Sequence, residues 1–139
     1  MPPLSPSAAA ARPPDEKITV NLGLVDLGQI DLLVQEGFYA NRTDLIRTAI
    51  RNQLAVHAEV VKQVVARRTL VLGIQHFSAA HLQAVQAAGE KLAIRVLGLA
   101  VIDADVTPEL ALATIESLTV LGALHASVPV KQALAARLR

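Results

Sequence analysis

Residues 17–54 read KITVNLGLVDLGQIDLLVQEGFYANRTDLIRTAIRNQL, and this stretch decides the fold. It opens with KITVNL, in which apolar and polar residues alternate with a period of two, as in a strand with one buried face. The apolar residues are Ile18, Val20 and Leu22, and the polar residues are Lys17, Thr19 and Asn21. No second strand follows nearby, so the backbone of this segment needs a partner from a second copy of the chain. We therefore expect a homodimer.

Two helices are expected after this strand. Apolar residues recur at helical spacing over residues 25–34, and Gly37 is placed to end that helix in the left-handed conformation. Asn41 suits the N-cap of the second helix, and Asp44 stands where a capping box carries an acid. Valines continue the helical pattern, which predicts that the second helix extends to about residue 67 as a stiff connector.

The strand, the first helix and the segment GFYANRTDLIRTAIRNQL together resemble the ribbon-helix-helix DNA-binding family of the MetJ, Arc and CopG type. The resemblance covers about residues 17–54 and implies an intertwined dimer whose paired strands enter the major groove of duplex DNA. The major groove distinguishes all four base pairs by their donors, acceptors and methyl groups. The resemblance therefore implies that Lys17, Thr19 and Asn21 read bases.

The start of the second helix is expected to hold the DNA backbone. Exposed amides at Asn41, Arg42 and Thr43 would form an anion site that suits a phosphate. Such contacts position a protein without reading sequence. The alternative interpretation is that Asn41 and Asp44 only cap a helix.

Composition narrows the classes of function. Aromatic residues make up only 2%, so stacking platforms for unpaired bases are missing, which argues against recognition of RNA or single strands. The chain has no cysteine, which excludes thiolate catalysis and disulfides. A net charge of +1 is modest for a DNA-binding protein, and within residues 15–54 acids outnumber basic residues six to four. This acidic balance weakens attraction to phosphate and argues against the DNA-binding hypothesis.

Neither catalysis nor metal binding is predicted. The serines lack a nucleophile-elbow context, and glycine-rich phosphate loops are absent. The four histidines are His57, His76, His81 and His125. His76 and His125 hold the same place in a repeat of the C-terminal part, but two strand spacings, roughly 9–10 Å, would separate them. We expect no enzyme activity, no metal and no cofactor.

The chain divides into three parts. Residues 1–14 hold five of the seven prolines, which predicts a disordered arm. Residues 15–67 are the expected ribbon-helix-helix domain with its extended second helix, and residues 69–139 are a C-terminal module. No signal peptide is recognised, and charged residues interrupt every apolar run before it reaches bilayer length. A cytoplasmic protein without membrane contact is therefore expected.

The C-terminal module contains the triplet Val-Leu-Gly three times, at residues 71–73, 96–98 and 120–122. Each triplet lies in a strand-like run that is followed by a helix-prone segment. A recurring unit of 20 to 30 residues predicts stacked repeats that bury their apolar faces against one another. We expect a small three-repeat, solenoid-like module with parallel strands on one side and helices on the other, giving an α+β protein overall. The alternative is chance similarity of the triplets.

The leading hypothesis is a sequence-specific DNA-binding transcriptional regulator that acts as a repressor. Its expected partners are double-stranded DNA and a second copy, with the C-terminal module joining dimers into tetramers or binding another protein. One alternative is an antitoxin that regulates its own operon and neutralises a toxin. Another is a structural self-assembly protein that uses the ribbon fold only for association.

Overall fold

The computed structural model describes residues 15–139, which form two compact units divided between Asn52 and Gln53. The arm expected at residues 1–14 lies outside the described part of the chain. The domain limits inferred from the sequence, 15–67 and 69–139, place the boundary later and stay a prediction.

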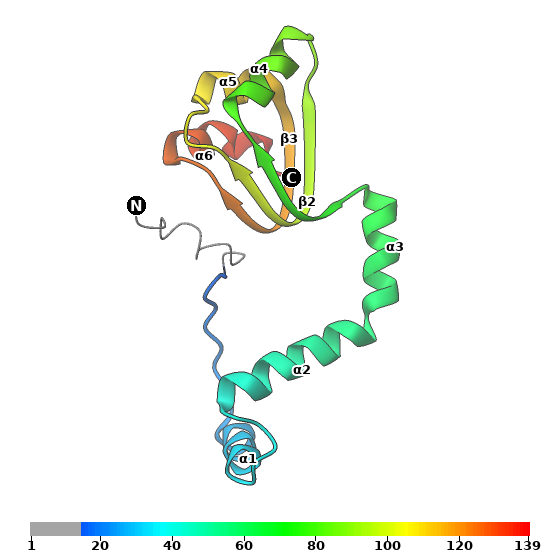
Figure 1. The fold of residues 1–139 in the computed structure, drawn as a ribbon, viewed down its shortest axis with the longest axis vertical. Coiled ribbons are helices and arrows are strands. Elements are labelled where there is room, and N and C mark those ends of the chain that lie inside the picture. The colour runs from blue at the N-terminus through cyan, green and yellow to red at the C-terminus, as the bar shows by residue number, and fades with distance from the viewer. Residues whose placement is uncertain (1–14) are drawn as a thin grey trace, which may run out of the picture. The chain divides into compact units, whose positions relative to one another are not determined.

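The N-terminal unit is an extended segment followed by two helices, α1 (Leu24–Gln35) and α2 (Arg42–Val56). As predicted, Gly37 ends α1 in the left-handed region, with φ 82°, and the amide of Phe38 bonds back to the carbonyl of Leu33 at 3.0 Å. The expected strand at residues 17–22 is not formed in the single chain, where this segment precedes α1 without a helical turn (Figure 1). A strand needs a hydrogen-bonded neighbour, and the rest of the described chain supplies none.

The second helix does not continue to residue 67, so this expectation is wrong. It ends at Val56, and a separate helix, α3 (Ala58–Arg68), follows. At the junction His57 has φ −98° and ψ 8°, and its amide bonds to Leu54, three residues back, at 3.1 Å. This tight turn lies in a valine-rich stretch, and β-branched residues favour helix less than straight-chain ones.

After α3, the C-terminal unit repeats a strand and a helix three times. The repeated part consists of β1 (Val71–Phe77), α4 (Ala79–Ala87), β2 (Leu92–Ile102), α5 (Pro108–Thr114), β3 (Ile115–His125), α6 (Val128–Leu134) and the short 3₁₀ helix η2 (Ala135–Arg137). The strands form a parallel sheet in the order β1-β2-β3, with helices α4, α5 and α6 on one side of it (Figure 1). The predicted order of strands and helices is confirmed, while the solenoid-like description stays a prediction.

The three triplets lie side by side in the sheet. Val71 is opposite Val96, which is opposite Val120, and the leucines and glycines that follow are paired in the same way. A sequence repeat whose step equals one strand, turn and helix places equivalent residues at the same height in successive strands. The repeat therefore sets the register of the sheet.

The three helices packed on the sheet, α4, α5 and α6, each begin at a hydroxyl cap. Ser78, Thr107 and Ser127 accept hydrogen bonds from amides three residues on, at 3.1, 3.2 and 3.4 Å respectively. Pro108 follows Thr107 at the first helical position, as predicted from the sequence. These local signals fix where the strands stop and the helices begin.

The hydrophobic core lies between the sheet and its three helices. It comprises Phe77, Leu82, Ile94, Val96, Ala100, Ile102, Val106, Ala111, Ile115, Leu118, Val130 and Leu134. The N-terminal unit differs, because not one of its described residues is buried. The C-terminal unit therefore has its own core, whereas the N-terminal unit lacks one in the single chain.

Candidate nucleic-acid interface

The extended segment before α1 carries an exposed apolar edge. Ile18 is 74% exposed, Val20 66% and Leu22 42%. These three residues share an open groove of about 810 Å³ with Ile46 and Ile50 of α2. Apolar side chains from the segment and from α2 therefore meet on one surface, which is where an apolar partner would complete a core.

The three predicted base readers lie on this same segment. Lys17, Thr19 and Asn21 are all exposed and alternate with the apolar residues. Lys17 also borders the groove, together with Thr43 from the start of α2. The fold thus brings one member of the predicted base-reading set close to one member of the predicted phosphate-binding set.

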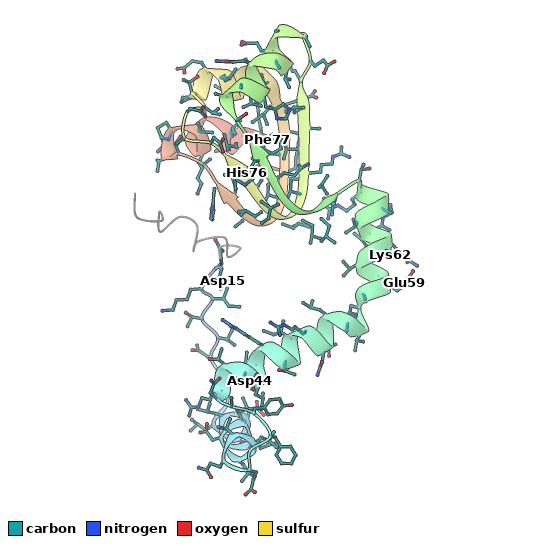
Figure 2. All side chains as sticks on the ribbon, in the orientation of Figure 1. Asp15, Asp44, Glu59, Lys62, His76 and Phe77 are labelled. Carbon is teal, nitrogen blue, oxygen red and sulfur yellow. The ribbon has the colours of Figure 1, made fainter. Side chains whose placement is uncertain are left out.

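The start of α2 is capped as the sequence predicts. The Oδ1 atom of Asn41 accepts a hydrogen bond from the amide of Asp44 at 2.8 Å. Asp44, labelled in Figure 2, in turn accepts from the amide of Ala40 at 3.0 Å, one residue earlier than a standard capping box. The side-chain oxygen of Asn41 is therefore used in the cap, and its contribution to an anion site would come through the backbone of the first turn.

Arg42, a predicted phosphate ligand, is held by an acid of α1. Its Nε and Nη2 atoms donate to the two carboxylate oxygens of Asp31 at 2.7 and 2.8 Å. The side chains are 55% and 41% exposed respectively, so solvent screens the pair. A phosphate would have to compete with Asp31 for this guanidinium.

The same contact shifts both groups toward their charged forms. The hydrogen bond from Arg42 lowers the pKa of Asp31, and the pKa of Arg42 is raised by the same bond. Because the carboxyl pKa is depressed in the folded chain, the pair contributes at pH values above the ordinary aspartate pKa, about 3.9. The contribution is lost as the pH falls through the lowered pKa of Asp31.

We expect Asp31→Asn to strengthen binding to duplex DNA by roughly three- to tenfold at low salt, because it frees Arg42 and removes a repelling charge from each copy. Fluorescence anisotropy with a labelled duplex measures the change. The matched control is Asp26→Asn, which removes the same charge from α1 but leaves the Arg42 pair intact. Equal gains from the two variants would mean that only net charge matters, and no gain from Asp31→Asn would place Arg42 away from the DNA.

The C-terminal unit carries a basic hollow that sequence reasoning missed. Its volume is about 530 Å³, and Arg68, Arg95 and Arg139 line it together with Glu116 and Thr119. Among residues 15–139, none of these three arginines has a carboxylate within ion-pair distance. The arginines lie far apart in the sequence, and only the pairing of the strands gathers them on one surface.

The histidines of the sheet do not form a metal centre in the described part of the chain. His76 and Phe77 are labelled in Figure 2. His76 Nδ1 lies 3.7 Å from Asp103 Oδ1, and the ring of Phe77 stacks on His81 with centroids 5.9 Å apart. His76 and His125 do occupy equivalent register positions, with Val101 between them. Across residues 15–139 no group of three or more histidine or acidic side chains is arranged to hold a metal ion.

A family model described as the Ribbon-Helix-Helix transcriptional regulator family matches residues 13–131. The chain belongs to this family. The match extends well past the resemblance seen at residues 17–54, so the sheet of this ribbon-helix-helix regulator is part of the family pattern. No curated protein and no solved structure matches the chain. Over residues 15–139, every helix is too short or too polar to cross a membrane.

Proposed function

We propose that this ribbon-helix-helix regulator is a homodimer that binds specific duplex DNA sequences and represses transcription by occluding a promoter. One observation carries the proposal: none of residues 15–52 of the N-terminal unit is buried, although Ile18, Val20 and Leu22 form an exposed apolar edge. A unit of this size without a core is not stable alone. Pairing of residues 17–22 with the same segment of a second copy would satisfy both backbones and bury the apolar edges.

Such pairing would turn the polar residues of the segment outward. Lysine donates to the acceptors of guanine, asparagine pairs with adenine through two hydrogen bonds, and threonine offers a hydroxyl and a methyl group. Lys17, Thr19 and Asn21 are therefore the proposed base readers, two sets per dimer. The first-turn amides of α2 at Asn41, Arg42 and Thr43 are the proposed phosphate contacts.

The acidic balance of residues 15–54 sets the expected strength of binding. Few phosphates would be neutralised per dimer, so one dimer is expected to bind with modest affinity and with a shallow salt slope, about −0.9 for each phosphate neutralised. Assembly of dimers through the C-terminal unit, or contact with another protein, would raise the affinity by avidity. This role also places the protein in the cytoplasm, where the DNA lies.

The experiment that tests the proposal measures binding of the full chain to random duplex DNA while salt is added. We expect binding at low salt. The logarithm of the binding constant should fall linearly with the logarithm of the salt concentration, because cations are released from the DNA on binding. Selection of tightly bound fragments from a random pool would then give the preferred sequence. Absence of binding at low salt would refute DNA recognition.

The proposed division of labour predicts different effects for neighbouring substitutions. We expect Asn21→Ala and Thr19→Ala to cost about 1–3 kcal/mol of discrimination between preferred and random sequences while leaving the dimer intact. Arg42→Ala should weaken binding to all sequences alike and lower the salt slope by about one for each phosphate that the arginine neutralises. Anisotropy titrations on the two DNA classes separate these effects, and equal losses from all three variants would contradict the assignment.

The strongest alternative is a protein that uses the ribbon fold only to associate. The acidic balance of residues 15–54 favours it, and so does the sheet, whose two edge strands are open to further pairing. The antitoxin alternative is less favoured, because toxin-binding tails usually fold on their target whereas the C-terminal unit here has its own core. The salt titration of DNA binding separates the regulator from the assembly protein.

A further inference from the structure

The sheet of the C-terminal unit has edges that match each other. β1 pairs with β2 in the same register in which β2 pairs with β3, valine to valine and glycine to glycine. The free edge of β3 therefore offers a further strand the same valine, leucine and glycine positions that β2 offers to β3. A strand with the pattern of β1 would continue the sheet there, with Val71 opposite Val120 of the other copy.

The glycines of the triplets add a second, independent match. Gly73, Gly98 and Gly122 all have positive φ, at 122°, 137° and 119°. A Cβ built on Gly98 would overlap the carbonyl oxygen of Gly73, and one built on Gly122 would overlap that of Gly98. At Gly73 the corresponding space is empty, with nothing within 4 Å. The carbonyl of Gly122 from another copy would fill this space, just as the carbonyl of Gly73 lies beside Gly98 and that of Gly98 lies beside Gly122.

The middle of the sheet face opposite the helices is apolar and uncovered, between Arg95 and Thr119 toward one end and His76 and His125 at the other. Leu72 is 68% exposed, Ile74 50% and Leu121 45%, and all three alternate with the helix-facing residues of their strands. Parallel sheets are almost always covered on both faces, so this surface needs a cover. If the sheet closed into a barrel through its edges, this face would line the barrel interior. Glycine kinks at one height in every strand allow a sheet to curve in this way.

We infer that the C-terminal units of two copies join edge to edge, β1 of each copy pairing in parallel with β3 of the other, to close a six-stranded barrel with the helices outside. The joint is heterologous at each edge, and two such joints close a ring with two-fold symmetry. The choice of two copies rests on the proposed homodimer, which would hold two C-terminal units in one particle at high effective concentration. The strand pairing itself rests on the sheet alone.

Leu138 and Arg139 contact only the first part of the free edge of β3. Leu138 forms an isolated parallel bridge with Leu118, and the amide of Arg139 bonds to the carbonyl of Leu118 at 2.8 Å. This contact lies two residues before Val120, which is the position where β1 of the other copy would begin. The rest of β3, through His125, is free of a strand neighbour on that side in the described chain.

Disulfide trapping in the full chain, which has no cysteine of its own, tests the pairing. Leu72 and Leu121 lie on the open face at the same height but on opposite edges, with Leu97 between them. Within one chain their Cα atoms are two strand spacings apart, roughly 9–10 Å, which is too far for a disulfide. Across the proposed joint they would be one spacing apart, about 4.8 Å, which a disulfide accepts.

We expect the double variant Leu72→Cys/Leu121→Cys to form covalent dimers under mild oxidation, with the 72–121 link identified by mass spectrometry. The single variants should stay uncrosslinked, and Leu72→Cys/Leu97→Cys should form only a link within the chain, as a control for folding and oxidation. A ladder of larger species would support the pairing but overturn the closed ring. No link at all, a 72–121 link within one chain, or equal dimers from Leu72→Cys alone would overturn the inference.

The failure of this inference is distinguishable from failure of the proposed function. Trapping reads the contact between C-terminal units, whereas the salt titration reads DNA binding by the N-terminal unit. Gly73→Ala supplies a further variant. Its φ of 122° strains an alanine already within the single chain, where the added Cβ meets nothing, and in the joint the Cβ would also meet the Gly122 carbonyl of the other copy. The link within the chain between Leu72→Cys and Leu97→Cys controls for that strain, because Gly73→Ala should leave it undiminished. In a Leu72→Cys/Leu121→Cys background, Gly73→Ala should reduce the yield of disulfide-linked dimer at least tenfold. Circular dichroism should show that the C-terminal unit is still folded. Undiminished trapping would contradict the glycine contact.

Discussion

Replacing Val20 with glutamate is expected to abolish the pairing of residues 17–22 between two copies of this ribbon-helix-helix regulator. In the single chain Val20 is 66% exposed, so the new charge costs little there. In the proposed dimer the side chain is buried between two copies, and an unpaired carboxylate at such a position costs about 4 kcal/mol or more. That cost raises the dissociation constant of the ribbon pairing by about three orders of magnitude. Sedimentation equilibrium over a range of protein concentrations measures it in a Gly73→Ala background, where the inferred joint between C-terminal units is weakened.

The neighbouring residue supplies a matched control. Thr19→Glu introduces the same charge one position away, on the polar side of the alternating segment. It should leave the dimer intact and weaken DNA binding, because the carboxylate would face the phosphates. The helicity of the two variants should also differ, because none of residues 15–52 is buried in the single chain. Val20→Glu is expected to lower the helical circular dichroism signal, whereas Thr19→Glu is expected to leave it unchanged. A protein carrying both Val20→Glu and Gly73→Ala that associates as tightly as Gly73→Ala alone would refute ribbon pairing.

The second large effect is expected at Gly98 in the middle of the sheet. Its φ of 137° lies in a region that L-residues avoid, and an added Cβ would overlap the backbone carbonyl of Gly73. Neither the strained φ nor the overlap can be relieved by turning a side chain, because the obstacle is backbone. We expect Gly98→Ala to cost at least about 3 kcal/mol of the stability of the C-terminal unit, which is a large part of what a small domain has.

Urea unfolding followed by circular dichroism measures this loss, and Gly89→Ala is its control. Gly89 also has positive φ, at 68°, but it lies in the left-handed helical region with nothing within 4 Å of an added Cβ. Its substitution should cost only about 1–2 kcal/mol. If the two variants were equally stable, the close approach of the strands at the triplets would not be a determinant of the fold.

Local signals explain which features of this protein were predictable. The cap at Asn41, the stop at Gly37 and the cap at Thr107 with Pro108 each involve residues a few positions apart, so their chemistry is visible in the sequence. The break at His57 was missed because a valine-rich pattern has helical spacing on both sides of it, and spacing alone does not show where a helix turns.

The candidate interface was only half visible for a related reason. The alternation of residues 17–22 indicated the base-reading side chains and the need for a second copy. The ion pair of Arg42 with Asp31 joins residues eleven positions apart on two helices, and no periodic pattern marks it. Because of that pair, Arg42 would have to break its hydrogen bonds to Asp31 before its side chain could bind a phosphate.

Apart from the break at His57, the helices and their caps follow from local sequence signals. The register of the sheet follows from the repeat, because a repeat of nearly constant length places the same residues at the same height in each strand. The tertiary structure alone decided which charges meet and which surfaces stay open: the Asp31 pair, the three arginines around one hollow and the uncovered face of the sheet. The physical reason is the sequence distance over which each feature is determined. Backbone conformation follows from neighbours along the chain, whereas electrostatic contacts and uncovered faces depend on how distant segments pack.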